Sequence, residues 1–290
     1  MKLGNNLRNT TQKSVLVTGV SSGIGRATAI RLAAAGWLVF GTVRRQEDIE
    51  ALVSLGLPGL VPLHLELDRR KDIPELARTV LAELEKRGSP GLFALVNNAG
   101  GSMVGPIELM NLDSFERELH ARLLGSVALV QAFLPSIRRA GGRILWIATP
   151  GTIPTTYVTG IHACDFAVNC IARTLAIELG SAGPSVVLVR CGGIRTRAGL
   201  DTMRELAAGL ETVAPERRTP YEERLKAWAA SMTSFDARRT DPDRVAETVE
   251  RALLAPRPRR RYRVGYMSGA AAFLEALPQI LVDRILSARQ

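Results

Sequence analysis

Glycines follow an apolar run near the start of the chain at a spacing that suits phosphate binding. The residues are Thr18-Gly19-Val20-Ser21-Ser22-Gly23-Ile24-Gly25, between the apolar run 14–17 and a helical stretch, 26–35. Glycines let the backbone turn tightly and approach a pyrophosphate, whose negative charge is met by the N–H groups and dipole of the helix start. The order of strand, glycine loop and helix therefore predicts a dinucleotide-binding site.

The elements that must position this loop alternate along the whole chain. After the first strand, apolar runs typical of strands occur at 37–42, 60–65, 92–96, 143–148 and 185–189, and helical patterns occur near 46–55, 73–87, 113–138 and 161–180. This alternation predicts right-handed βαβ crossovers. We expect an α/β fold: one Rossmann-type, doubly wound parallel sheet of about seven strands, with helices on both faces and a C-terminal helical lid.

The remaining segments complete a single predicted domain over residues 1–290. Residues 1–13 form a polar tail, and 266–290 form an amphipathic segment that could pack on the body, form a dimer contact or touch a membrane surface. The segment 197–240 follows the sixth strand, and ligands of open α/β sheets bind beyond the carboxyl ends of the strands. We therefore expect it to cover the substrate.

Composition limits the classes of protein to consider. No apolar run approaches the roughly 18 residues needed to cross a bilayer, the polar N-terminus lacks a signal core, and the three cysteines have no metal-binding spacing. A cytoplasmic protein without a metal site or stable membrane insertion is expected. The formal charge is +10, and its densest basic cluster, 257–263, is accompanied by no nucleic-acid-binding motif. We interpret it as a solvated face and expect no nucleic-acid partner.

Taken together, the chain resembles the short-chain dehydrogenase/reductase family over nearly its whole length. The loop 18–25 matches the family's Thr-Gly-x-x-x-Gly-x-Gly, and Asn97-Asn98-Ala99-Gly100 matches its Asn-Asn-Ala-Gly element under the adenine side. Residues 192–196 resemble the loop where a Thr meets the nicotinamide amide, although Cys191 replaces the usual Pro, and 241–265 looks like the steroid, retinol and hydroxybutyrate dehydrogenase branch. The resemblance implies these cofactor-binding residues: Thr18, Gly19, Ser21, Ser22, Gly23, Ile24, Gly25, Asn98, Ala99, Gly100, Gly192, Ile194 and Thr196.

The catalytic set that the resemblance implies is altered. The family uses Asn, Ser, Tyr and Lys; aligning the chain on Gly125 places Arg122 at the Asn position. Thr149 stands at the Ser position, His162 at the Tyr position and Phe166 at the Lys position. The Tyr-x-x-x-Lys pair is therefore missing.

Charge at the end of the second strand indicates the cofactor. A carboxylate there would accept a hydrogen bond from the ribose 2′-hydroxyl and repel a 2′-phosphate. The chain instead has Val43 followed by Arg44 and Arg45. A guanidinium binds phosphate with paired hydrogen bonds, so NADP(H) is favoured. Glu66 stands where the family often has an Asp near the adenine.

The altered site could still reduce a ketone. A Tyr, with a reference pKa of about 10, needs a neighbouring cation to act as an acid, whereas a His, at about 6.5, does not. His162 could donate the proton, Thr149 could hold the carbonyl oxygen, and Arg122 could supply a cation and stack on Phe166. Two alternatives are that His162 has no proton role and that an acidic substrate hydroxyl supplies the proton. Asp165 is expected to be solvated or paired along its helix.

Three functions follow from this reading. The first is an atypical NADP(H)-dependent carbonyl reductase acting on a bulky hydrophobic substrate, such as a specialised metabolite. The second is a non-redox enzyme on the same scaffold, a cyclase or isomerase using His162 for proton transfer. The third is a non-catalytic cofactor-binding protein. By analogy with the family we expect a homo-oligomer formed through the helices at 113–138 and 161–180.

Overall fold

A computed structural model describes residues 12–101, 103–150 and 153–287, and its centre is a seven-stranded parallel sheet. The strand order is β3-β2-β1-β4-β5-β6-β7, and every neighbouring pair is parallel. The strands are β1 (Ser14–Thr18), β2 (Leu38–Val43), β3 (Leu60–His64), β4 (Ala94–Asn97), β5 (Arg143–Ala148), β6 (Ser185–Cys191) and β7 (Arg261–Val264). The predicted doubly wound parallel sheet is confirmed.

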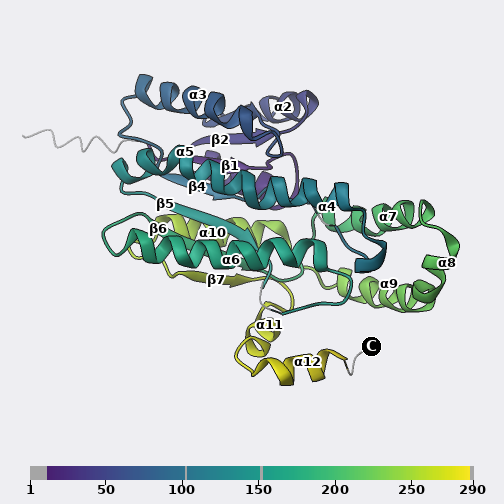
Figure 1. Cartoon of the computed structure of the whole chain (residues 1–290). Helices are drawn as coiled ribbons and strands as arrows, with labels where there is room; N and C mark the ends of the chain where they lie inside the picture. The colour runs from purple at the N-terminus through teal and green to yellow at the C-terminus, as the bar shows by residue number, and fades with distance from the viewer. Residues whose placement is uncertain (1–11, 102, 151–152, 288–290) are drawn as a thin grey trace, which may run out of the picture.

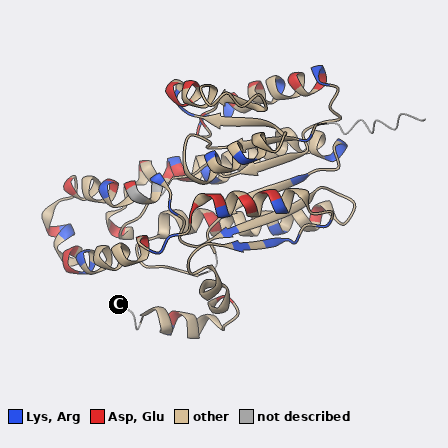
Figure 2. Ribbon diagram, turned by 180° about the vertical axis from the view of Figure 1, so that it is seen from behind, with Lys and Arg blue, Asp and Glu red and all other residues tan. Residues whose placement is uncertain are grey.

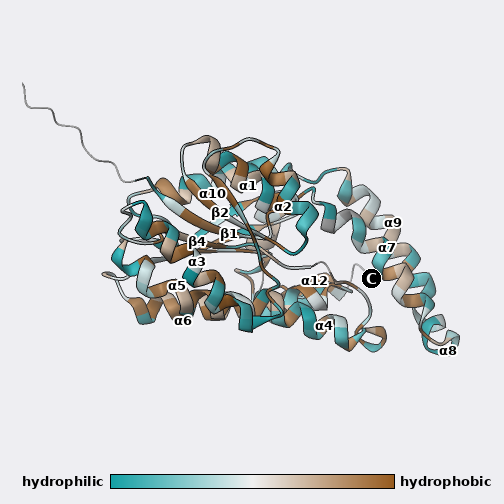
Figure 3. Cartoon of the chain, turned by 90° about the horizontal axis from the view of Figure 1, so that it is seen from above, coloured by the Kyte–Doolittle hydropathy of each residue, from teal (hydrophilic) through white to brown (hydrophobic). Residues whose placement is uncertain are grey.

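Helices cover both faces of this sheet (Figure 1). One face carries α1 (Gly23–Ala34), α2 (Gln46–Val53) and α10 (Pro242–Leu254), and the other carries α3 (Ile73–Lys86), α5 (Gly125–Arg139) and α6 (Thr159–Leu179). Each face has its own apolar core, and the central strands are buried on both sides, which is why the three residues inside β1 are continuously apolar rather than alternating. In Figure 3 the brown apolar residues follow the strands and several of the covering helices.

The predicted helix at 113–138 is interrupted. It consists of α4 (Leu112–Glu118), a π-helical turn η3 (Leu119–Leu124) and then α5. A π turn inserts an extra residue into the helical ladder and occurs frequently at functional sites. Arg122, a predicted catalytic residue, lies within this turn.

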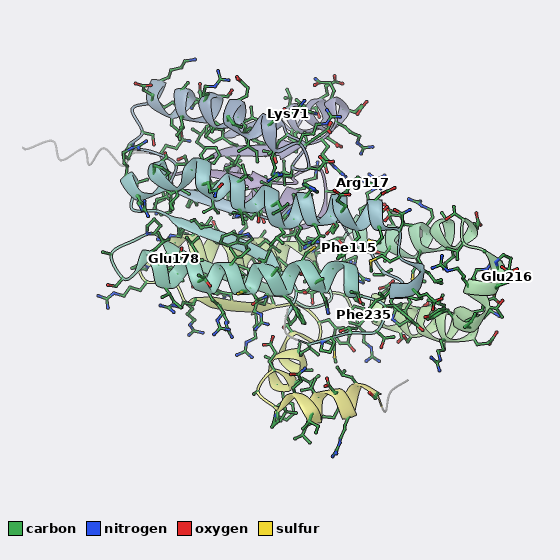
Figure 4. The ribbon with its side chains drawn as sticks, in the orientation of Figure 1. Lys71, Phe115, Arg117, Glu178, Glu216 and Phe235 are labelled. Atoms are coloured by element: carbon green, nitrogen blue, oxygen red, sulfur yellow. The ribbon has the colours of Figure 1, made fainter. Side chains whose placement is uncertain are left out.

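The segment 197–240 forms a helical arm. It contains α7 (Arg197–Glu211), α8 (Pro215–Arg218), the short helix η4 (Thr219–Tyr221) and α9 (Glu222–Asp236). In Figure 4, Glu216 marks the tip of the arm and Phe235 its base, where α9 returns to the body. The arm contacts the loops beyond the carboxyl ends of the strands: the Tyr221 hydroxyl donates to Glu108 at 2.8 Å, and the Trp228 ring meets Tyr157 edge to face.

The chain ends in two short helices beside the edge strand β7. They are α11 (Ser268–Leu274) and α12 (Gln279–Ser287), and α11 is anchored through an ion pair between Arg190 of β6 and Glu275. The arginines between 257 and 263 are exposed along this edge, as the interpretation of the basic cluster expected (Figure 2). The part of the chain that the structure describes has no helix long and apolar enough to cross a membrane. Two short 3-10 helices, η1 (Arg70–Asp72) and η2 (Ile107–Leu109), complete the elements.

Candidate active site

The glycine loop has the tight geometry that its sequence predicts. Gly19 and Gly23 have φ angles of 71° and 56°, in the left-handed region that glycine tolerates. A Cβ at Gly25 would clash with the carbonyl oxygen of Gly19, so only glycine lets the helix start approach the end of β1. Ser22 occupies the N-cap position of α1, and its side chain makes no capping hydrogen bond. The exposed Ser21 is its neighbour, and both hydroxyls are available to a phosphate.

The neighbouring strand end braces this loop. The Asn98 amide nitrogen donates to the carbonyl oxygens of Thr18 at 2.9 Å and Gly19 at 3.2 Å. In return, the Thr18 hydroxyl accepts from the backbone N–H groups of Asn98 and Ala99 at 2.9 and 3.0 Å. Thr18 and Asn98 therefore hold the loop in shape, whichever further contacts they make with a cofactor.

The loop after β6 lies against the other side of the glycine loop, where Thr196 approaches Gly23. Gly192 lies against the backbone of Tyr266, and Ile194 is buried. The Thr196 hydroxyl accepts from the N–H of Gly199 at 3.1 Å and so caps α7, while its methyl carbon lies 3.1 Å from where a Cβ of Gly23 would be. Thr196 thus links the arm to the phosphate loop, a role additional to the predicted contact with the nicotinamide amide.

The charged groups near the end of β2 differ in their availability. The Arg45 Nε pairs with Asp48 at 3.2 Å, whereas the Arg44 side chain has no partner among the described residues. Glu66 pairs with Arg69 at 2.9 Å. Of the two predicted arginines, Arg44 is therefore the more accessible to a phosphate.

These features fit a nicotinamide dinucleotide. A glycine cradle that any Cβ would fill meets a helix start whose N–H groups favour an anion. Such a cofactor supplies a hydride donor or acceptor when bound. The strand order also reverses between β1 and β4, the switch point where ligands of doubly wound sheets bind.

Beside this cradle, Arg122 is the centre of a buried polar network. Its Nε donates to Glu118 at 2.7 Å, its Nη1 to Asp165 at 3.1 Å and its Nη2 to the carbonyl of Gly101 at 2.7 Å. Burial lowers the pKa of Arg122, but Asp165 and Glu118 more than offset this and raise it, so the guanidinium stays charged. The predicted stacking of Arg122 on Phe166 is wrong: the guanidinium lies between two carboxylates, and the Phe166 ring stacks on His162, with centroids 6.1 Å apart.

Asp165 is buried, which corrects the expectation of a solvated residue. Only 1% of it is exposed. Its Oδ1 accepts from Arg122, and its Oδ2 accepts from the backbone N–H of Thr149 at 2.7 Å. A carboxylate with both oxygens engaged fixes the end of β5 against α6, which is a positioning role.

Thr149 has a free hydroxyl at this fixed position. Its Oγ1 is buried and has no hydrogen-bond partner within the described chain. A buried hydroxyl without a partner costs free energy, and a ligand atom in hydrogen-bonding reach would recover it. The structure therefore shows an unsatisfied group at the residue predicted to hold a carbonyl oxygen.

His162 is held in a defined orientation one turn before Phe166. Its Nδ1 lies 3.1 Å from the carbonyl oxygen of Ile153, so that nitrogen carries the proton and Nε2 keeps its lone pair. Burial lowers the pKa of His162 below its ordinary value; Asp165 and the Ile153 carbonyl oppose this shift, and Arg122 adds to it. The ring is neutral at neutral pH.

Two features of this network were not predicted from the sequence: the participation of Glu118 and the pairing of Asp165 with Arg122. Glu118 lies four residues before Arg122, a spacing typical of an ion pair along a helix. Cys164, beside Asp165, is no nucleophile because burial raises the pKa of its thiol to about 12. The arm also contains an apolar cavity of about 270 Å³ between α7 and α9, lined in part by Met203, Leu206 and Leu225, and none of the predicted catalytic residues borders it.

Comparisons with known proteins agree with this geometry. Residues 13–206 match the family model described as short chain dehydrogenase. The chain is 32% identical over 263 residues to 3-amino-tetrahydro-pyrrolizinone reductase of Xenorhabdus hominickii, covering 88% of this chain and 87% of that protein. It is 31% identical over 258 residues to human 17-beta-hydroxysteroid dehydrogenase type 1, covering 86% and 76% of the two chains.

Among solved structures, a short-chain dehydrogenase from Streptomyces avermitilis superposes with a TM-score of 0.75, at 23% identity, over 97% of this chain and 98% of that one. The likeness in structure shows the shared fold, and the family model and sequence relatives show ancestry. The chain is an oxidoreductase that belongs to the short-chain dehydrogenase/reductase family.

Proposed function

We propose that the protein is an atypical NADP(H)-dependent carbonyl reductase without the Tyr-x-x-x-Lys pair, acting on a bulky hydrophobic substrate. The observation that carries this proposal is the buried, unpartnered Thr149 hydroxyl beside a glycine cradle shaped for a dinucleotide. Thr149 donates a hydrogen bond to the carbonyl oxygen and orients it. Asp165 and Arg122 keep Thr149 in place and contact no substrate themselves.

His162 is the proton donor for the developing alkoxide. Because burial lowers its pKa, the protonated form grows only as the pH falls below the ordinary value of about 6.5. Ketone reduction should therefore be faster in mildly acidic than in alkaline solution. Arm residues on α7 and α9 cover the substrate, supported by the contact of Trp228 with Tyr157 five residues before His162.

Arg44 selects the 2′-phosphate of NADP(H). Calorimetric titration with NADPH and with NADH should show tighter binding of NADPH, because a charge-assisted contact with a phosphate contributes about 1.5–3 kcal/mol. Arg44→Ala should weaken NADPH binding roughly 10- to 100-fold and leave NADH binding unchanged. Arg45→Ala, whose guanidinium is shared with Asp48, is the matched control with a smaller loss. Equal affinity of the wild-type protein for both cofactors would reject NADP(H) selectivity, and binding of neither would reject the reductase.

A non-redox proton-transfer enzyme is the second candidate. It is favoured by one observation, the neutral His162 ring with Nδ1 held by Ile153, which suits a general base. Product formation without any change in cofactor absorbance would support it over the reductase.

A further inference from the structure

We propose that the site also reduces protonated imines, by hydride transfer to the carbon of a C=N⁺ group, and prefers them to neutral ketones at neutral pH. This inference rests on the proposed hydride transfer and names a second substrate class for the same site. It follows from the charge around Thr149 and His162 and from the proton that each reaction requires.

The buried network carries an excess negative charge. One guanidinium, Arg122, lies between the carboxylates of Glu118 and Asp165, which are 8% and 1% exposed in their side chains. The family's Lys, the cation that would offset the second carboxylate, is replaced by Phe166. The charged groups that face His162 are Asp165 and Arg122, and of these Asp165 acts more strongly. The fixed charges beside His162 therefore favour a cation over an anion, while burial opposes both.

The aromatic ring at position 166 adds to this bias. Phe166 stacks on His162 with an interplanar angle of 20° and a centroid distance of 6.1 Å, so two roughly parallel aromatic rings lie where the resemblance implies a Lys. Aromatic faces attract a delocalised cation, so the cation loses less free energy of solvation beside them than beside aliphatic side chains. Burial disfavours a cation here, as the lowered pKa of His162 shows, and Asp165 opposes that cost.

The proton balance of the two reactions separates the substrates. A ketone gains a hydride at carbon and needs a proton on oxygen, and His162 is largely neutral at pH 7 and supplies one poorly. A protonated imine has already taken its proton from water: hydride transfer from the reduced nicotinamide forms the C–H bond, the C=N π electrons become the nitrogen lone pair, and a neutral amine results. No protein acid takes part. The unpartnered hydroxyl oxygen of Thr149 accepts a hydrogen bond from the N–H group of the substrate.

The first test measures binding without turnover. 1,2,3,4-Tetrahydroisoquinoline, a cation at neutral pH, should bind at least tenfold more tightly than the neutral 2-tetralol in calorimetric titrations. Phe166→Lys places a cation at a partly exposed position. It should weaken binding of the amine at least tenfold, and binding of the alcohol should change less than twofold. Phe166→Met is the control for loss of the ring alone. Equal binding of amine and alcohol by the wild-type protein would overturn the proposal.

The second test uses NADPH with 3,4-dihydroisoquinoline and 2-tetralone as matched imine and ketone. The ratio of imine to ketone kcat/KM should exceed 10 at pH 7. His162→Phe should raise this ratio more in mildly acidic solution than at pH 7, because only the protonated ring acts as the general acid and only the ketone reaction uses it. Reduction of 2-tetralone but not of the imine would reject this inference and leave the carbonyl reductase standing. Failure to bind NADPH at all would instead reject the proposed function, while the charge preference remains measurable by the first test.

Discussion

At the scale of single residues, the site depends on one buried carboxylate outside the family's catalytic set of Asn, Ser, Tyr and Lys. Asp165 bonds to both Arg122 and the backbone of Thr149, so it joins α6, the π-helical turn and the end of β5. Among the residues that the structure describes, its loss would leave the Arg122 charge with Glu118 as the one ionic partner. The network therefore stabilises the fold and holds the reactive hydroxyl in place.

Asp165→Asn should lower the free energy of unfolding by about 2–3 kcal/mol, because it removes a charged hydrogen bond from a buried guanidinium. Urea denaturation followed by circular dichroism measures this loss. Glu223→Gln, in an exposed pair with Lys226, is the matched control and should leave the midpoint unchanged within error. An equally small effect at Asp165 would contradict the network's role.

His162 should make stability depend on pH. Its folded-state pKa lies below the unfolded value of about 6.5, so the unfolded chain binds the proton more readily. This contribution to stability is present above pH 6.5 and is lost as the pH falls towards the folded-state pKa. Between pH 7 and 5.5, His162→Gln should lose less stability than the wild-type protein in chemical denaturation. Between pH 8 and 9 the two should change in parallel; identical curves at acidic pH would disprove the effect.

At the scale of elements, the phosphate loop depends on the approach of α1 to β1. Gly25 sets that approach, since a side chain there meets the carbonyl of Gly19 and the amide of Asn98. The π-helical turn is a second local feature of the site, because it places Arg122 beside Gly100 and Gly101 in the loop after β4.

Gly25→Ala should weaken NADPH binding at least about 100-fold by forcing the loop open, as fluorescence titration would show. Gly209→Ala is a matched control, because a Cβ at this exposed position in α7 meets nothing within 4 Å. That change should leave cofactor affinity intact and raise the free energy of unfolding by about 0.5–1 kcal/mol through helix propensity. Unaltered affinity in Gly25→Ala would show that the loop does not carry the cofactor.

At the scale of the whole molecule, the outer faces of α4, η3 and α6 have exposed apolar side chains. Leu112 of α4 is 72% exposed, Ile177 of α6 is 73% exposed and Leu124 of η3 is 38% exposed. We propose that these helices form the interface of a homo-oligomer, since such side chains are otherwise left in water.

Ile177→Lys should convert the oligomer to a monomer in light scattering, because an unpaired charge would be buried at the interface. Val53→Lys, on the similarly exposed Val53 of α2, is the control and should leave the assembly unchanged. A wild-type monomer at working concentrations would refute the proposed interface.

The sequence by itself determined the sheet, the glycine cradle and the family, because local patterns specify these features: apolar runs for buried strands, glycines for a tight turn, and fixed spacing between motifs. It also predicts Thr149 and His162 as catalytic residues, and these assignments stay predictions. Only the tertiary structure decided the charge of the site. Glu118, Arg122 and Asp165 come from separate helical segments, and their pairing depends on the π-helical turn and on α6 packing beside it. Periodicity placed Asp165 on a helix but did not identify its partner. Burial sets the charge interactions of Asp165 and the pKa of His162, and burial arises only when those elements pack together.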